Sequence, residues 1–231
     1  MNWLLIVVIG IIIFNGWRGK RKGFIKAVFT IFSTIIAIVI TLWISPYITK
    51  MLQNNDNIMN FVNTKVEELT MPDDSVDKKT EEVQYIEELP VPLLIKSILS
   101  ENNNSDVYSV LSVNNFGSYV NNVLSVFLIN IGAFLFIFIM VKIILHIIST
   151  TLDLVSSLPI LSGINSIAGL LVGLVYGIIV VWVGFTVITL FANYEFPQYL
   201  ITQINESELL SSLYNYNVIL IILTDSSKVL F

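Results

Sequence analysis

The sequence has no cysteine, a single histidine and few charges. Of its 231 residues, none is Cys, one is His, and 13% are Asp, Glu, Lys or Arg. These absences exclude disulfide scaffolds, thiolate metal sites, cysteine nucleophiles and any metal centre that needs two imidazoles. The formal net charge of −5 argues against a general affinity for nucleic acid. We therefore expect no nucleic-acid partner, no cofactor and no metal, and no residue pattern indicates a catalytic site.

Apolar residues are present in excess. They make up 55% of the chain, and the mean hydropathy is +0.80. Soluble domains carry about 45–50% apolar residues and about 25% charged ones, so one water-soluble core cannot bury this excess. The composition predicts an integral membrane protein, with the lipid bilayer as its first partner.

Long runs without charge locate the membrane helices. A spanning helix needs roughly 20 apolar residues to cross about 30 Å of hydrocarbon. Three runs are long enough, centred on Phe24–Ile44, Val120–Ile144 and Ile164–Phe191. A fourth, Trp3–Phe14, is shorter and leaves open a thin span, a tilted interfacial helix or a re-entrant segment. We predict an all-α, polytopic fold with four transmembrane helices, the first one short, and a helical or irregular extracytoplasmic loop.

The charges are distributed unevenly, which predicts an orientation. Five of the twelve Lys and Arg lie within nine positions, from Arg18 to Lys26. Basic loops stay in the cytoplasm, and no signal-peptide cleavage pattern precedes them. Residues 46–117 hold twelve acids and five lysines, as a translocated segment does. The predicted parts are 1–45, two helices with a basic cytoplasmic turn; 46–118, an acidic outside loop; 119–192, the third and fourth helices; and 193–231, an outside tail.

The outside segments contain shorter helical patterns. Apolar residues recur at helical spacing between Ile48 and Leu69, and a further helix over Glu81–Glu88 must end before Pro90. Leu93–Leu99 predicts another short helix. The apolar run Val218–Leu223 is too short to span, so we expect it at the membrane interface or packed on the loop. The loop itself is either a solvated cap or a surface for a partner.

Small residues form a stripe on the fourth predicted span. Asn165, Gly169, Gly173 and Gly177 are four residues apart, which keeps them on one helix face, and Gly184 continues it. In lipid, such faces allow another helix to approach closely. We expect packing within the chain against the third span, near Gly132. A contact between copies in a homo-oligomer and a pore lining are the alternatives.

A second group of residues forms the basic turn. Glycines permit a tight reversal of the chain, and the cations either anchor the topology or meet anionic lipid headgroups. Its members are Gly16, Arg18, Gly19, Lys20, Arg21, Lys22 and Gly23.

Ionisable and polar residues also follow the third predicted span. Lys142, His146, Ser149 and Asp153 lie on one side of a helix. They could form a proton relay or a wet face beside the membrane.

Two sequence blocks together resemble the colicin V production (CvpA) family of bacterial inner-membrane proteins. After the opening Asn2-Trp3-Leu4, the first block is the glycine-flanked basic segment from Gly16 to Lys26, which includes Gly23-Phe24-Ile25. The second runs from Leu158 to Gly169 and continues through Gly173 and Gly177. The family often carries an Asp near the start, where this chain has Leu4-Leu5.

The resemblance implies a fold and a role. It covers the membrane helices and leaves out the acidic loop and the tail. It implies a multi-pass protein of the bacterial cytoplasmic membrane, linked to toxin production, secretion or envelope homeostasis, without catalytic residues. We accordingly expect a non-enzymatic protein that acts through helix packing and through secretion or envelope partners. The alternative is a small oligomeric channel or transporter built around the glycine face.

Overall fold

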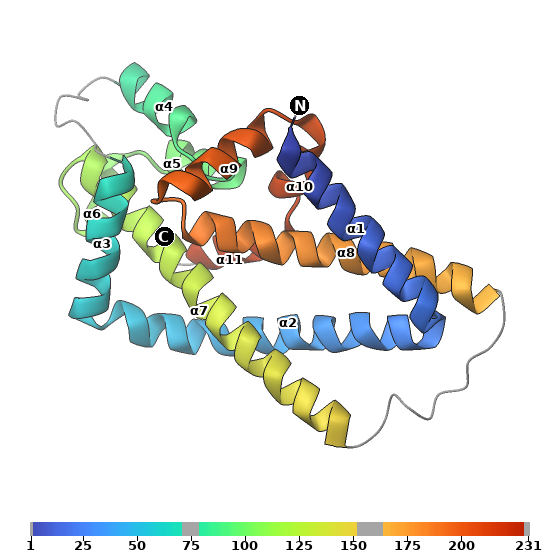
Figure 1. The fold of residues 1–231 in the computed structure, drawn as a ribbon. Coiled ribbons are helices and arrows are strands. Elements are labelled where there is room, and N and C mark those ends of the chain that lie inside the picture. The colour runs from blue at the N-terminus through green and yellow to red at the C-terminus, as the bar shows by residue number, and fades with distance from the viewer. Residues whose placement is uncertain (1, 71–78, 152–163, 229–231) are drawn as a thin grey trace. The chain divides into compact units, whose positions relative to one another are not determined.

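A computed structural model gives an all-helical, multi-pass membrane protein (Figure 1). The structure describes residues 2–70, 79–151 and 164–228. Within them, four helices are long and apolar enough to cross a membrane: α1 (Trp3–Lys22), α2 (Phe24–Gln53), α7 (Phe116–Thr151) and α8 (Ile164–Leu190). The predicted fold class is confirmed. Helix α1 has 20 residues, which is the length a span requires.

Helices α1 and α2 are joined by a one-residue reversal. At the start of α1, the Asn2 side chain accepts a hydrogen bond from the Leu5 amide at 3.1 Å. The helix ends at Lys22, and Gly23 reverses the chain with a φ of 78°, a conformation that favours glycine. The structure corrects the predicted extent of the basic turn, because every member from Gly16 to Lys22 lies inside α1 and only Gly23 forms the reversal.

Helices α2 and α7 are longer than the spans expected from hydropathy. Helix α2 continues through Pro46 to Gln53. Proline removes one backbone donor but does not end a membrane helix when neighbouring groups satisfy the freed carbonyl. Helix α7 has 36 residues, about 54 Å at 1.5 Å per residue. Part of α7 therefore extends beyond about 30 Å of hydrocarbon.

The chain divides into two compact units. Unit 1 comprises residues 1–45 and 134–185, and unit 2 comprises 46–133 and 186–231. In unit 1, α2 buries small residues, namely Ala27, Thr34, Ala37 and Thr41, and exposes large apolar ones, namely Phe29, Phe32, Ile36 and Val39. In a soluble protein, large apolar residues would face the core. Here they face outward, as expected of a helix whose outer face meets lipid, and the buried small residues let neighbouring helices approach.

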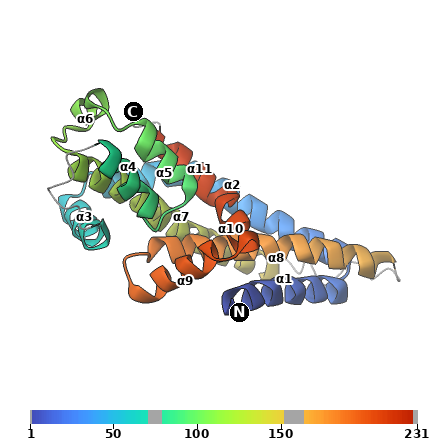
Figure 2. The same ribbon diagram turned by 90° about the horizontal axis from the view of Figure 1, so that it is seen from above.

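Unit 2 is built around the first half of α7, where Tyr119, Phe127 and Ile131 are fully buried. Shorter helices belong to this unit. Those of the loop are α3 (Asp56–Thr70), α4 (Lys79–Glu88), α5 (Leu93–Glu101) and α6 (Ser105–Leu111), and those of the tail are α9 (Glu195–Asn205), α10 (Glu208–Asn215) and α11 (Val218–Lys228). Figure 2 shows α4, α5 and α11 in a second view.

Several predictions for these segments are confirmed. An amphipathic helix, α3, lies within the predicted stretch, α4 ends before Pro90, and α5 begins right after Pro92. The apolar run at Val218 forms α11, which packs on α5 of the loop. Helices α6, α9 and α10 were not predicted.

Hydrogen bonds within unit 2 join the loop to the tail, the tail to the end of α8, and α3 to α7. The Leu93 amide donates to Asn215 Oδ1 at 3.2 Å, and the hydroxyls of Thr189 and Tyr214 are 2.9 Å apart. Asn121 donates to the Asn63 carbonyl oxygen at 3.3 Å, which ties α7 to α3. The loop and the tail therefore fold together.

Candidate functional site: the glycine interface and its basic pocket

The glycine stripe of α8 lies against α1, which carries glycines of its own. We call this contact the glycine interface; its members are Gly16, Gly19, Gly23, Gly169, Gly173 and Gly177, all buried. A Cβ atom added at Gly19 would collide with the Gly169 carbonyl oxygen, and one added at Gly173 would collide with that of Asn15. The two helices thus meet backbone to backbone, an approach that only glycine permits.

The contacts run in opposite order along the two helices. A Cβ atom at Gly177 would lie 2.8 Å from the Cα of Ile12, whereas one at Gly23 would lie 2.7 Å from Asn165 Nδ2. Helices α1 and α8 are therefore antiparallel, and both views show them side by side (Figures 1 and 2). The end of α1, the start of α2 and the start of α8 consequently lie together.

Two side chains at the start of α8 complete the reversal between α1 and α2. Asn165 Oδ1 accepts a hydrogen bond from the Phe24 amide at 2.7 Å. The Ser166 hydroxyl donates to the Lys20 carbonyl oxygen at 3.2 Å. The first amide of one helix and a late carbonyl of the other would otherwise lack partners, so α8 caps both helix ends from outside.

The expected partner of the stripe was wrong, and so was its extent. We expected α8 to pack on the third span near Gly132, but a Cβ atom at Gly132 would meet only Leu190, at 3.8 Å. Gly184 is exposed, and a Cβ atom there would meet nothing within 4 Å. The close packing ends at Gly177 because the four-residue spacing stops there.

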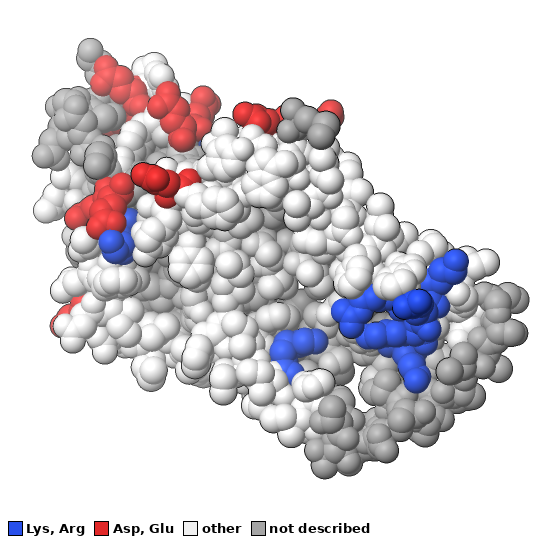
Figure 3. Space-filling view, in the orientation of Figure 1, with Lys and Arg blue, Asp and Glu red and all other residues white. Residues whose placement is uncertain are grey.

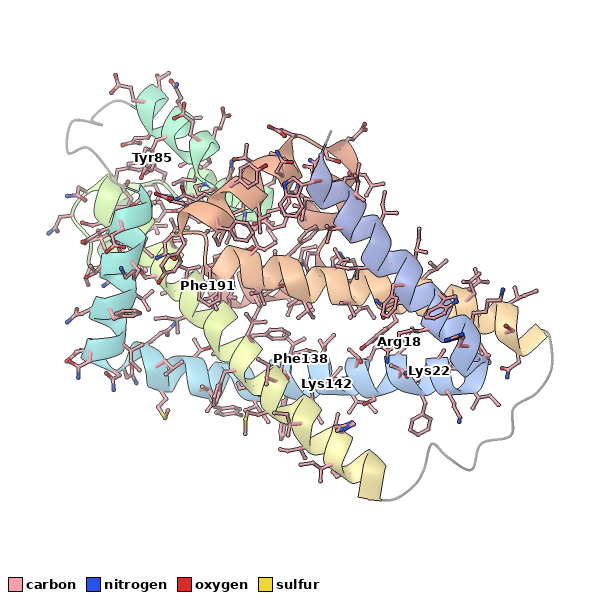
Figure 4. The ribbon with its side chains drawn as sticks, in the orientation of Figure 1. Arg18, Lys22, Tyr85, Phe138, Lys142 and Phe191 are labelled. Atoms are coloured by element: carbon pink, nitrogen blue, oxygen red, sulfur yellow. The ribbon has the colours of Figure 1, made fainter. Side chains whose placement is uncertain are left out.

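A small pocket lies beside the glycine interface, between α1, α2 and α8. Its volume is about 70 Å³. Gly19, Gly173 and Ala27 are its small residues, and five polar side chains complete the lining: Asn15, Arg18, Lys22, Thr30 and Tyr176. Figure 4 shows Arg18 and Lys22 on the same side of α1, one turn apart. This space is open because Gly19 and Gly173 have no side chains to fill it.

The basic residues gather at the end of α1, and Figure 3 shows them as one patch. The Arg21 guanidinium lies 4.1 Å from the centroid of the Trp17 ring, and that of Arg18 lies 5.8 Å from the Phe14 ring. Such cation–π contacts use the face of the guanidinium and leave its N–H donors at the edge. Lys20 is exposed and does not line the pocket.

The predicted group on the third span is only partly described. Lys142 of α7, labelled in Figure 4, donates from Nζ to the Thr34 hydroxyl of α2 at 3.0 Å. His146 is exposed. The side chain of Ser149 and all of Asp153 lie outside the described residues. Thr34 is a partner that the sequence did not reveal, since nothing in its spacing relates it to Lys142.

A polar cluster in unit 2 connects α4 with α6. Asn103 Nδ2 donates to Glu82 at 2.6 Å, and the Tyr108 hydroxyl donates to Asn103 Oδ1. Burial raises the pKa of Tyr108 to about 12, and the nearby charge of Glu82 acts in the same direction. The ring of Tyr108 also stacks on Tyr119 at 5.1 Å between centroids. This cluster holds α4 and α6 together.

Nothing in the described residues assembles a metal centre, because no group of three or more His, Asp or Glu lies close enough to hold a metal ion. The candidate site therefore consists of a close helix contact and a cationic pocket. Asn15, Thr30 and Tyr176 were missed by sequence reasoning. The sequence could have identified Asn15 as a candidate, because it is a single amide side chain at the end of an apolar run.

Comparison with known proteins assigns a family. The family model described as "Colicin V production protein" matches residues 5–69 and 107–217, most of the chain. The match includes much of the tail, which the resemblance was expected to leave out, and omits residues 70–106. Searches of curated proteins and of solved structures found no match. The chain belongs to the colicin V production protein family.

Proposed function

We propose that the protein is a non-enzymatic component of the bacterial cytoplasmic membrane that supports toxin production, secretion or envelope homeostasis. Family membership supports this role. The observation that carries it is the glycine interface, because the small-residue face of α8 is filled by α1 of the same chain. The membrane helices then anchor the chain in the bilayer, and the outside loop and tail are available to bind partners.

The packing favours this role over the oligomeric channel. A pore lined by the glycine face would need Gly169, Gly173 and Gly177 to be accessible, but all three are buried against α1. Secretion or envelope proteins would then bind to unit 2, whose surface carries most of the acidic side chains (Figure 3). A homo-oligomer remains compatible with this role through other faces of the helices.

The test is complementation in a colicin V-secreting bacterium that lacks its own family member. The unmodified chain should restore toxin in the medium. Gly173→Ala should not, because the added methyl group meets the Asn15 carbonyl oxygen, whereas Gly184→Ala on the same helix has open space and should restore it. The clash costs about 1–3 kcal/mol, which exceeds the roughly 1 kcal/mol that Ala gains over Gly in a helix.

A measurement of ion flux distinguishes the proposed role from the oligomeric channel. Purified protein in liposomes should conduct no ions above empty liposomes. Ion flux that Gly173→Ala abolishes and Gly184→Ala preserves would replace the proposed role with the channel. Failure of the unmodified chain to restore toxin secretion, although it reaches the membrane, would overturn the link to toxin production.

A further inference from the structure

Within the part of unit 1 that the structure describes, the cations have no carboxylate beside them. The residues of this unit that the structure describes include Arg18, Lys20, Arg21, Lys22, Lys26 and Lys142, and no Asp or Glu. The ion pair found in the described chain, between Lys65 and Glu68, lies in unit 2. The described cations of unit 1 are therefore suited to bind an anion from outside the protein.

The basic pocket concentrates two of these cations with neutral hydrogen-bonding groups. Arg18 and Lys22 come from α1, Thr30 from α2 and Tyr176 from α8, so three helices contribute. Asn15 is buried and uses one N–H on the Ile11 carbonyl oxygen at 2.8 Å, which leaves its second N–H for the pocket. Thr30 lines the pocket but donates its hydroxyl proton to the Lys26 carbonyl oxygen at 2.9 Å. The guanidinium, the ammonium and the donors of Asn15 and Tyr176 around a common space match the several oxygens of a phosphate group.

The size and depth of the pocket also suit a phosphate group. A water molecule needs roughly 10–15 Å³ of such space, so about 70 Å³ admits several oxygen-sized atoms. Lys22 ends α1, and Arg18 lies one turn, about 6 Å, before it. The headgroup layers of a bilayer add roughly 5–7 Å on each side of the hydrocarbon. A headgroup layer is therefore thick enough to hold both Arg18 and Lys22 at the level of the lipid phosphates.

We propose that this pocket binds a phosphate group, with Arg18 and Lys22 as its charged donors. Arg18 would bind two phosphate oxygens through its planar N–H edge, and Lys22 would bind a third. The phosphate can belong to the headgroup of an anionic lipid or to free inorganic phosphate, and the chemistry of recognition is the same. Lys20, Arg21 and Lys26 do not line the pocket, and they attract anions only through their charge.

The experiment uses native mass spectrometry of the purified full chain in a detergent that retains lipid. Protein from nanodiscs of phosphatidylglycerol and phosphatidylcholine should keep phosphatidylglycerol. The pocket variant Arg18→Gln/Lys22→Gln should keep at least about tenfold less, because each charge-assisted hydrogen bond exceeds the 1.4 kcal/mol that a factor of ten represents. The control variant Lys20→Gln/Lys26→Gln loses the same charge outside the pocket and should bind like the unmodified chain.

A second arm identifies the source of the phosphate and does not depend on the proposed function. Inorganic phosphate is added to lipid-free protein, and the melting temperature is compared with that in chloride of equal ionic strength. A phosphate-specific rise that the pocket variant loses would support the site with free phosphate as its ligand. The proposal is overturned if neither lipid nor phosphate binds, or if the pocket and control variants lose binding equally. Circular dichroism of both variants establishes that they are folded.

Discussion

At the residue scale, Asn165 is the side chain on which the reversal between α1 and α2 depends. Replacing it by Ala leaves the Phe24 amide without its 2.7 Å acceptor. Loss of a helix-capping side chain costs about 1 kcal/mol, within a range of roughly 0.5–2. We expect Asn165→Ala to lower the free energy of unfolding in detergent by that amount, measured by denaturant titration. Asn165→Asp keeps an acceptor oxygen and should cost less. Equal losses in both variants would exclude the capping role.

Tyr108 gives unit 2 a dependence on alkaline pH. Its pKa is raised to about 12 in the folded protein, whereas an unfolded tyrosine ionises near about 10. Between these values only the unfolded state releases the proton, so stability is complete below pH 10 and falls as the pH rises toward 12. Tyr108→Phe removes this contribution. The free energy of unfolding of the variant should decline less steeply above pH 10, and parallel curves would contradict the assignment.

At the element scale, the antiparallel contact of α1 and α8 can be trapped by a disulfide. A Cβ atom at Gly16 would lie 3.0 Å from Leu174 Cγ. One further carbon–carbon bond of about 1.5 Å separates that atom from Leu174 Cβ, so the two Cβ atoms are within about 4.5 Å, as a disulfide requires. Shortening Leu174 to Cys also removes the atoms that would clash. The pair Gly16→Cys/Leu174→Cys should therefore cross-link on mild oxidation in native membranes.

The control pair is Gly16→Cys/Leu171→Cys, because Leu171 lies on the same helix but is 59% exposed. This pair should stay unlinked. The chain has no other cysteine, so every cross-link is assignable. A product of monomer size supports packing within the chain. A dimer as the main product of the Leu174 pair would instead place the glycine interface between two copies.

The four long helices were predictable, but the partner of the glycine stripe was not. Charge-free runs report length directly, which is why α2, α7 and α8 were located. A small-residue stripe identifies a close-packing face and does not name the opposite helix. Gly16 and Gly19 carry the complementary face, but the basic residues around them suggested a turn. Helices α9 and α10 were missed because short amphipathic helices are held mainly by tertiary contacts, such as Tyr214 with Thr189.

The pocket was beyond prediction for a related reason. Arg18 and Lys22 belong to a motif that the sequence displays, whereas Thr30 and Tyr176 come from two other helices. Only the backbone contact at Gly19 and Gly173 brings α8 close enough to join them. The spacing of residues in a sequence shows which side chains share a face of one helix. It cannot show which residues of three different helices meet, so this site could be found only in the folded structure.

At the scale of the whole molecule, the charge distribution predicts an orientation, and the contacts of α8 extend that prediction to the tail. Residues 18–26 carry five positive charges, and residues 46–117 carry a net −7 from twelve acids and five lysines. The charge rule therefore predicts that the segment around Gly23 lies in the cytoplasm and the loop outside. The contacts at Asn165 and Ser166 bring the start of α8 to the same end as Gly23. With this orientation we expect α8 to run outward, so that the tail after Leu190 emerges on the outer side of the membrane.

Single cysteines test this orientation with a membrane-impermeant maleimide on spheroplasts. Glu88→Cys in the loop and Glu206→Cys in the tail are exposed positions and should react in intact spheroplasts. Lys20→Cys, exposed near the end of α1, should react only after lysis, because the reagent cannot reach the cytoplasm. The order should reverse in inverted vesicles. Labelling of Lys20→Cys in intact spheroplasts would refute the cytoplasmic turn, and labelling of Glu88→Cys without Glu206→Cys would show that α8 does not carry the chain across.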